Sequence, residues 1–303
     1  MPDTKFRERW LAVASAAAML AACSGGDRGD SGTRSQSGSA APAAATPAPR
    51  PAGADASVAA TPSRPVDSET LPYAEVEDQL AYGYFAFPSD MVEPLPAIVL
   101  IHDWWGLNEE ARAAANRLAA EGYMVLAVDL YRGEVVSDAP AARDRTIAVL
   151  EDPAAVEDNL RQAIEFVEDV AGAPAVGAVG WGFGGSWALE SAMLFPDSIA
   201  AVVVVYGQVS SDESRLADLE APVLAIFGGA DRSISQDTID SFGAAMERLG
   251  NALEIEIYPD AGHAFADPAR SKYDPGVAEA AWRRMLGFFA EALPSEGREE
   301  DSQ

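Results

Sequence analysis

The chain has 303 residues, with 21 Lys or Arg against 48 Asp or Glu, so its formal net charge is −27 at pH 7. Lysine occurs only at Lys5 and Lys272. No basic stripe is available to neutralise phosphates, so the composition argues against a nucleic-acid-binding protein. It suits a soluble domain that an anionic membrane surface repels.

Residues 1–22 are predicted to form a lipoprotein signal peptide. A basic start at Lys5, Arg7 and Arg9 precedes a short apolar run at 11–20, which is too short to span a membrane. The sequence L-A-A-C at 20–23 resembles a bacterial lipobox, which implies cleavage before Cys23 and lipid on its sulfur. Ser24 follows, and the sorting rule for lipoproteins then favours the outer membrane, facing the periplasm. An ordinary secretory signal with a chance cysteine is the alternative.

Cys23 is the only cysteine, so no intramolecular disulfide can form. Residues 23–69 are rich in Ala, Pro, Ser and Gly and are predicted to be a disordered tether that spans on the order of 40 Å. Residues 70–294 have the length of a single α/β domain, and residues 295–303 form an acidic tail.

Within this domain the pattern begins with an antiparallel hairpin over residues 73–87. Continuous apolar runs, typical of strands covered on both faces, then alternate with helical patterns. The alternation predicts a doubly wound, mostly parallel α/β sheet. The predicted strands are 97–101, 123–127, 175–179, 200–205, 223–227 and 253–258, and the predicted helices are 109–120, 154–170, 185–194, 236–249 and 277–292.

The most informative motif is G-W-G-F-G-G at residues 180–185, between a predicted strand and a predicted helix. It has the frame of a nucleophile elbow, G-x-Nuc-x-G, in which a sharp turn exposes a Ser or Cys. Gly182 stands at the nucleophile position. Ser186 lies a turn into the helix and does not replace it.

Three further motifs follow predicted strands: H-D-W-W-G-L-N at 102–108, G-G-A-D at 228–231 and D-A-G-H-A-F at 260–265. Together with the elbow, and with weaker support from D-L-Y at 129–131, they resemble the dienelactone hydrolase family. The resemblance covers nearly the whole folded domain in the order nucleophile, acid, histidine. It implies an α/β-hydrolase fold and hydrolysis of a small-molecule ester or lactone.

The resemblance also implies roles for individual residues. Asp231 matches the triad acid and His263 the general base, while the backbone N–H groups of Trp104 and Phe183 match the oxyanion hole. A further set is expected to line the pocket: Asp103, which matches a family acidic residue shortened by one methylene, together with Trp105 and Tyr131.

One departure concerns the substrate, because Asp267 stands where family members that bind dienelactone have an arginine. Arg132, Arg143 or Arg145 are the remaining candidates for a cation that could hold a substrate carboxylate. The two histidines, in unrelated loops, provide no motif such as H-E-x-x-H, so we expect neither a metal nor a cofactor. No obligate protein partner is evident, and the predicted membrane contact is the lipid anchor alone.

Gly182 leaves three alternatives open. The chain is a weak hydrolase in which His263 activates a water admitted to the vacated space, a pseudoenzyme that binds a small ligand, or a hydrolase with an accidental glycine. A glycine at this turn relieves the backbone strain that a residue with a Cβ would suffer.

Overall fold

The computed structural model describes residues 64–294. The predicted signal peptide, Cys23, most of the predicted tether and the acidic tail lie outside these residues. The first strand, β1 (Val66–Val76), begins four residues before the domain start expected at residue 70. Its residues 67–70 are exposed and lack an apolar pattern, and they are held by pairing with β2 (Gln79–Pro88).

The described residues form an eight-stranded sheet in the order β1-β2-β4-β3-β5-β6-β7-β8. β1 and β2 form an antiparallel hairpin, β2 pairs antiparallel with β4, and all other pairs are parallel. This is the predicted fold class, a mostly parallel sheet that opens with an antiparallel hairpin. The remaining strands are β3 (Ala97–Ile101), β4 (Met124–Val128), β5 (Val176–Trp181), β6 (Ile199–Val205), β7 (Val223–Gly228) and β8 (Leu253–Tyr258).

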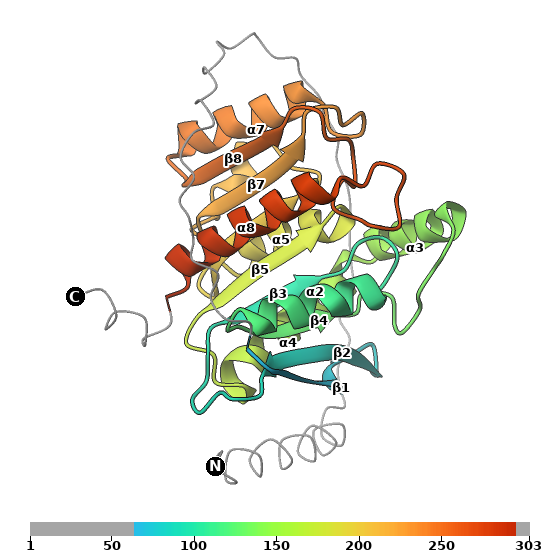
Figure 1. Ribbon diagram of the computed structural model, residues 1–303, viewed down its shortest axis with the longest axis vertical. Coiled ribbons are helices and arrows are strands. Elements are labelled where there is room, and N and C mark those ends of the chain that lie inside the picture. The colour runs from blue at the N-terminus through green and yellow to red at the C-terminus, as the bar shows by residue number, and fades with distance from the viewer. Residues whose placement is uncertain (1–63, 295–303) are drawn as a thin grey trace, which may run out of the picture.

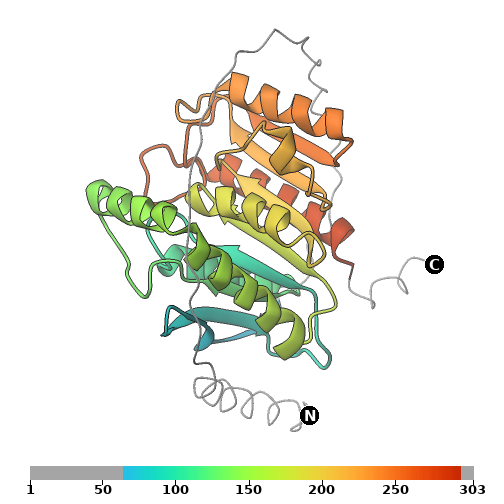
Figure 2. The same ribbon diagram turned by 180° about the vertical axis from the view of Figure 1, so that it is seen from behind.

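Helices cover both faces of this sheet. Figure 1 shows α2 (Glu109–Ala120) and α8 (Pro275–Ala292) on the face toward the viewer. Figure 2 shows the opposite face, which is covered by α4 (Pro153–Glu165), α5 (Phe183–Leu194) and α7 (Gln236–Leu249). The other helices are α3 (Ala139–Glu151), the short α6 (Glu213–Leu216) and the π-helical turn η1 (Phe166–Val170), which continues α4.

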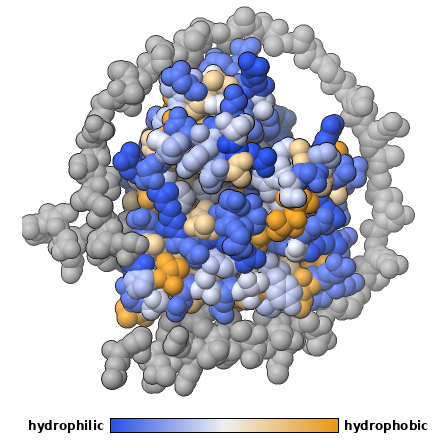
Figure 3. All heavy atoms as spheres, turned by 45° about the vertical axis from the view of Figure 1, so that its right-hand side comes forward, coloured by the Kyte–Doolittle hydropathy of each residue, from blue (hydrophilic) through white to orange (hydrophobic). Residues whose placement is uncertain are grey.

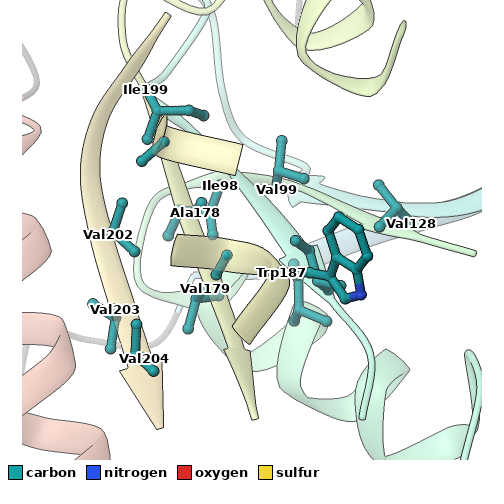
Figure 4. Close-up of a cluster of buried hydrophobic side chains, with 14 of the residues drawn as sticks. Ile98, Val99, Val128, Ala178, Val179, Trp187, Ile199, Val202, Val203 and Val204 are labelled. Atoms are coloured by element: carbon teal, nitrogen blue, oxygen red, sulfur yellow. The ribbon is translucent and has the colours of Figure 1, made fainter. Parts of the chain in front are cut away.

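The core is packed where the central strands meet α5. Every residue of β3 and β4 is buried, as the continuous apolar runs predict for strands covered on both faces. Figure 4 shows aliphatic side chains of β5 and β6, with Ile98 and Val99 of β3 and Val128 of β4, grouped beside Trp187 of α5. This rigid centre carries the strand ends from which the site is built.

No helix among residues 64–294 is both long enough and apolar enough to cross a membrane.

Candidate active site

Gly182 lies in the sharp turn between β5 and α5. Its backbone has φ 53° and ψ −116°, a conformation that strains any residue with a Cβ. The Gly182 N–H donates to the carbonyl of Val205 at 2.9 Å, so the turn is tied to β6. The Ser186 hydroxyl donates to the carbonyl of Gly182 and accepts from the N–H of Gln208. The Ser186 hydroxyl therefore stabilises the turn, and it does not take the position of a nucleophile at the tip of the turn.

The loops after β7 and β8 bring Asp231 and His263 together. His263 Nδ1 lies 2.8 Å from Asp231 Oδ2, and the second oxygen of Asp231 accepts from the N–H groups of Ser233 and Ile234. The Asp231 side chain is fully buried, whereas the His263 side chain is 41 % exposed. A buried carboxylate that orients a partly exposed imidazole is the arrangement found for a histidine that acts as a general base.

The carboxylate of Asp103 lies against Gly182. Asp103 Oδ1 accepts from the N–H of Trp104 at 2.7 Å and from the N–H of Phe183 at 3.1 Å. A Cβ built on Gly182 would lie 2.5 Å from the same oxygen and 3.1 Å from Oδ2. The carboxylate thus occupies the space beside the turn and uses both N–H groups that the sequence assigns to the oxyanion hole. The sequence indicates that Asp103 is near this turn, but not that its oxygen fills it.

Burial raises the pKa of Asp103 to about 6, against the opposing effects of the hydrogen bonds from Trp104 and Phe183 and of nearby His263. Asp267 adds a smaller repulsive contribution in the same direction as burial. Asp103 is therefore ionised at pH 7 but close to the pH at which it takes up a proton. The N-terminus of α5, which begins at Phe183, adds a favourable dipole for this anion.

His102 supports the backbone that carries Asp103. Its buried ring accepts from the N–H of Leu130 at Nε2, so Nδ1 carries the proton and donates to the carbonyl of Asp103 at 2.7 Å. Burial lowers the pKa of His102, which keeps the ring neutral despite the nearby Asp129. His102 thus has a local hydrogen-bonding role at the end of β3.

A cavity of about 330 Å³ lies beside Asp103, between α2, α8 and the loop after His263. Its wall is rich in aromatic and apolar side chains and includes the predicted pocket residue Trp105. Trp181 also lines it and stacks on Trp282 of α8, with ring centroids 6.4 Å apart. The size and the apolar lining suit a small organic molecule.

The charged residues that line this cavity are mostly acidic. Asp103, Glu110, Asp267 and Glu279 face one arginine, Arg117, whose guanidinium pairs with Glu279 at 2.6 Å and lies over the ring of Trp282. An anionic ligand would therefore meet a net negative wall.

The three arginines that the sequence offered as candidate cations are engaged elsewhere or exposed. Arg132 pairs with Glu77, Arg145 pairs with Glu134, and Arg143 is exposed on α3. Sequence reasoning did not single out Arg270, which pairs with Asp267 and lies 3.6 Å above the ring of Trp105.

Tyr131, predicted to line the pocket, is not among the residues that line this cavity. Its ring packs edge-on against His102 at 4.8 Å, its hydroxyl contacts that of Thr146, and it lines a separate hollow near β1 and α4. In residues 64–294, no three His, Cys, Asp or Glu side chains are grouped so that they could hold a metal ion.

Comparison with known proteins matches residues 82–293 to the dienelactone hydrolase family. A protein of Escherichia coli strain K12 named "Putative carboxymethylenebutenolidase" is 30% identical over 248 residues, which cover 78% of this chain and 88% of the relative. A protein of the same name from Methylorubrum extorquens is 31% identical, with 77% and 85% covered.

Among solved structures, a crystal structure from Klebsiella pneumoniae, named "Putative Dienelactone Hydrolase", is 28% identical. It superimposes with a TM-score of 0.68, covering 75% of this chain and 99% of the Klebsiella chain. The order of the strands, the paired Asp231 and His263 and these similarities agree, and the chain belongs to the dienelactone hydrolase family.

Proposed function

We propose that the protein is a membrane-anchored relative of ester and lactone hydrolases in which turnover through an acyl-enzyme is weak or lost. The observation that supports this is the contact between Asp103 and the turn at Gly182. Gly182 supplies no atom that can form an acyl-enzyme, and the two N–H groups that would bind an ester oxyanion already bind the Asp103 carboxylate. An ester carbonyl would have to displace that carboxylate before it could be polarised.

The same contact weakens the hypothesis of water-mediated ester hydrolysis. A water placed beside Gly182 would compete with Asp103 Oδ1 for the same space. The alternative function, a pseudoenzyme that binds a small ligand, is favoured by the 330 Å³ aromatic cavity, which does not depend on a nucleophile. In either case the acidic lining favours uncharged ligands over carboxylates such as dienelactone.

Hydrolysis of an uncharged aryl acetate tests this proposal. We expect the parent protein to be close to the uncatalysed rate. Gly182→Cys alone should gain little, because the new Cβ approaches Asp103 and the carboxylate still blocks the amides. The double variant Gly182→Cys with Asp103→Ala should gain most, since it restores a nucleophile and frees both donors.

Adding His263→Ala to the double variant should remove the gain, because the thiol then has no base. A parent protein that hydrolyses the aryl acetate rapidly, and loses this activity in His263→Ala, would contradict the proposal. Binding without turnover would be read from ligand-dependent shifts in melting temperature of the parent protein.

A further inference from the structure

We propose that Asp103 is itself a nucleophile, and that the protein hydrolyses uncharged alkyl halides by displacement at saturated carbon. The nucleophile that Gly182 does not supply is then supplied by a carboxylate that follows a different strand, β3. This activity differs from ester hydrolysis, because attack occurs at an alkyl carbon and not at a carbonyl.

The first support is the way the carboxylate is held. Oδ1 accepts both backbone N–H groups, at 2.7 and 3.1 Å, while Oδ2 has no hydrogen-bond partner among residues 64–294. One oxygen is thus fixed and the other retains its lone pairs for attack. A carboxylate with both oxygens hydrogen-bonded would be a poorer nucleophile, and one with neither held would lack a defined direction.

The second support is the cavity beside Asp103. Its aromatic and apolar wall can bury an alkyl chain, and partial desolvation strengthens a carboxylate nucleophile. The acidic residues of the wall disfavour an anionic substrate and so favour an uncharged one.

The third support is that the chain also holds the groups that the hydrolytic half of the reaction needs, namely two N–H groups on Asp103 Oδ1 and the pair of His263 and Asp231. In the first step Asp103 Oδ2 forms a bond to the alkyl carbon, and the carbon–halogen bond breaks with its electron pair leaving on the halide. The product is an alkyl ester of Asp103. Its carbonyl oxygen is Oδ1, which already lies on the N–H groups of Trp104 and Phe183.

In the second step His263, oriented by Asp231, takes a proton from water as the water oxygen attacks Cγ of Asp103. The negative charge that develops on Oδ1 is stabilised by the two N–H groups. Collapse breaks the bond between Cγ and the ester oxygen, and the alkoxide takes the proton back from His263. Loss of a proton from the new carboxyl group restores the carboxylate, so an alkyl halide and water give an alcohol, a halide ion and a proton.

The test uses the full chain in mild detergent with 6-bromohexanol, an uncharged probe. Single turnover in ¹⁸O-water should place one heavy oxygen in Asp103 and leave the alcohol unlabelled, as mass spectrometry of peptides and product will show. In His263→Gln the first step should still occur. One equivalent of bromide should be released and the hydroxyhexyl ester should accumulate on Asp103.

Three comparisons sharpen the experiment. Asp103→Asn should abolish bromide release, whereas Asp260→Asn, a change at an exposed aspartate near His263, should retain it. The anionic analogue 6-bromohexanoate should react more slowly than 6-bromohexanol, on the order of ten-fold or more. Absence of bromide release above the buffer rate, heavy oxygen found only in the alcohol, or alkylation at a residue other than Asp103 would each overturn the proposal.

Discussion

At the residue scale, Asp103 couples stability to pH. Burial raises the pKa of its carboxyl to about 6 from an ordinary value of 3.8, so the folded protein holds the proton more tightly than the unfolded chain. Ionisation therefore costs stability as the pH rises from about 4 to about 6, and the full cost remains above this range. Asp103→Asn removes the charge but keeps an oxygen that can accept from Trp104 and Phe183. We expect it to stabilise the protein at pH 8 by on the order of 1–3 kcal/mol.

Urea unfolding of the parent and of Asp103→Asn at pH 4 and pH 8 measures this effect. At pH 4 the parent carboxyl is mostly protonated in the folded state, so the two proteins should have nearly equal stability. A difference that is the same at both pH values would show that the charge is not its cause.

The sequence indicated which residues belong to the site, but not how the carboxylate is used. The motifs after β3, β7 and β8 predict that Asp103, Asp231 and His263 meet at one edge of the sheet, because parallel strands end there together. In the structure the carboxylate of Asp231 does lie within hydrogen-bond distance of Nδ1 of His263. The rotamer of Asp103 depends on the space beside Gly182, and such a space exists only after the elements have packed.

At the scale of elements, α5 packs closely on the central strands through glycine. A Cβ on Gly184 would overlap the carbonyl of Ile101 and lie 2.5 Å from the carbonyl of His102, both of them backbone atoms that cannot rotate away. We expect Gly184→Ala to destabilise the fold by on the order of 3 kcal/mol or more, and to displace the N–H of Phe183 from Asp103.

Gly287→Ala is the matched control, because Gly287 also lies in a helix, α8, and a Cβ there meets no atom within 4 Å. The control should stabilise the protein by about 0.5–1 kcal/mol through helix propensity. Thermal unfolding of both variants gives the comparison, and equal effects of the two alanines would contradict the close approach of α5 to β3.

Helices and strands with a strong apolar pattern were predicted within two residues of their observed bounds. The prediction is confirmed at both ends for β3, β8, α2 and α7. Two of the helices between residues 64 and 294 were not predicted: α3 buries only Ala142, and α6 has four residues with only Leu216 buried. Neither has the apolar stripe from which a helix is recognised. The change to π-helical hydrogen bonding at η1 leaves the apolar spacing of residues 154–170 nearly intact, so the sequence showed one continuous helix.

At the scale of the whole molecule, net charge is the dominant surface property. Hydrophilic residues cover most of the side shown in Figure 3, and hydrophobic ones form separate smaller patches. The described ion pairs between Arg and Asp or Glu all involve partly exposed side chains, and such pairs contribute little to stability. Repulsion from a net charge of −27 should therefore outweigh them.

Salt should accordingly raise the melting temperature. Increasing NaCl from about 0.02 M to about 0.5 M shortens the screening length and weakens the repulsion among carboxylates. LiCl at the same ionic strength is the control, and it should give a similar rise if screening is the cause. A fall in melting temperature with both salts would mean that the ion pairs contribute more than the net repulsion.

The predicted lipid anchor would decide where this charged domain works. The lipobox predicted at residues 20–23 provides one attachment point, Cys23, and the tether after it would let the domain stand clear of headgroups that repel it. Cys23→Ala should therefore abolish incorporation of labelled fatty acid and leave the protein out of the membrane fraction. Ser24→Ala, one residue away, should leave lipidation intact. Unlipidated protein that stays bound to the membrane would contradict the prediction of a lipid anchor. That outcome would not bear on the proposed chemistry of Asp103, because the catalytic proposals involve only residues of the folded domain.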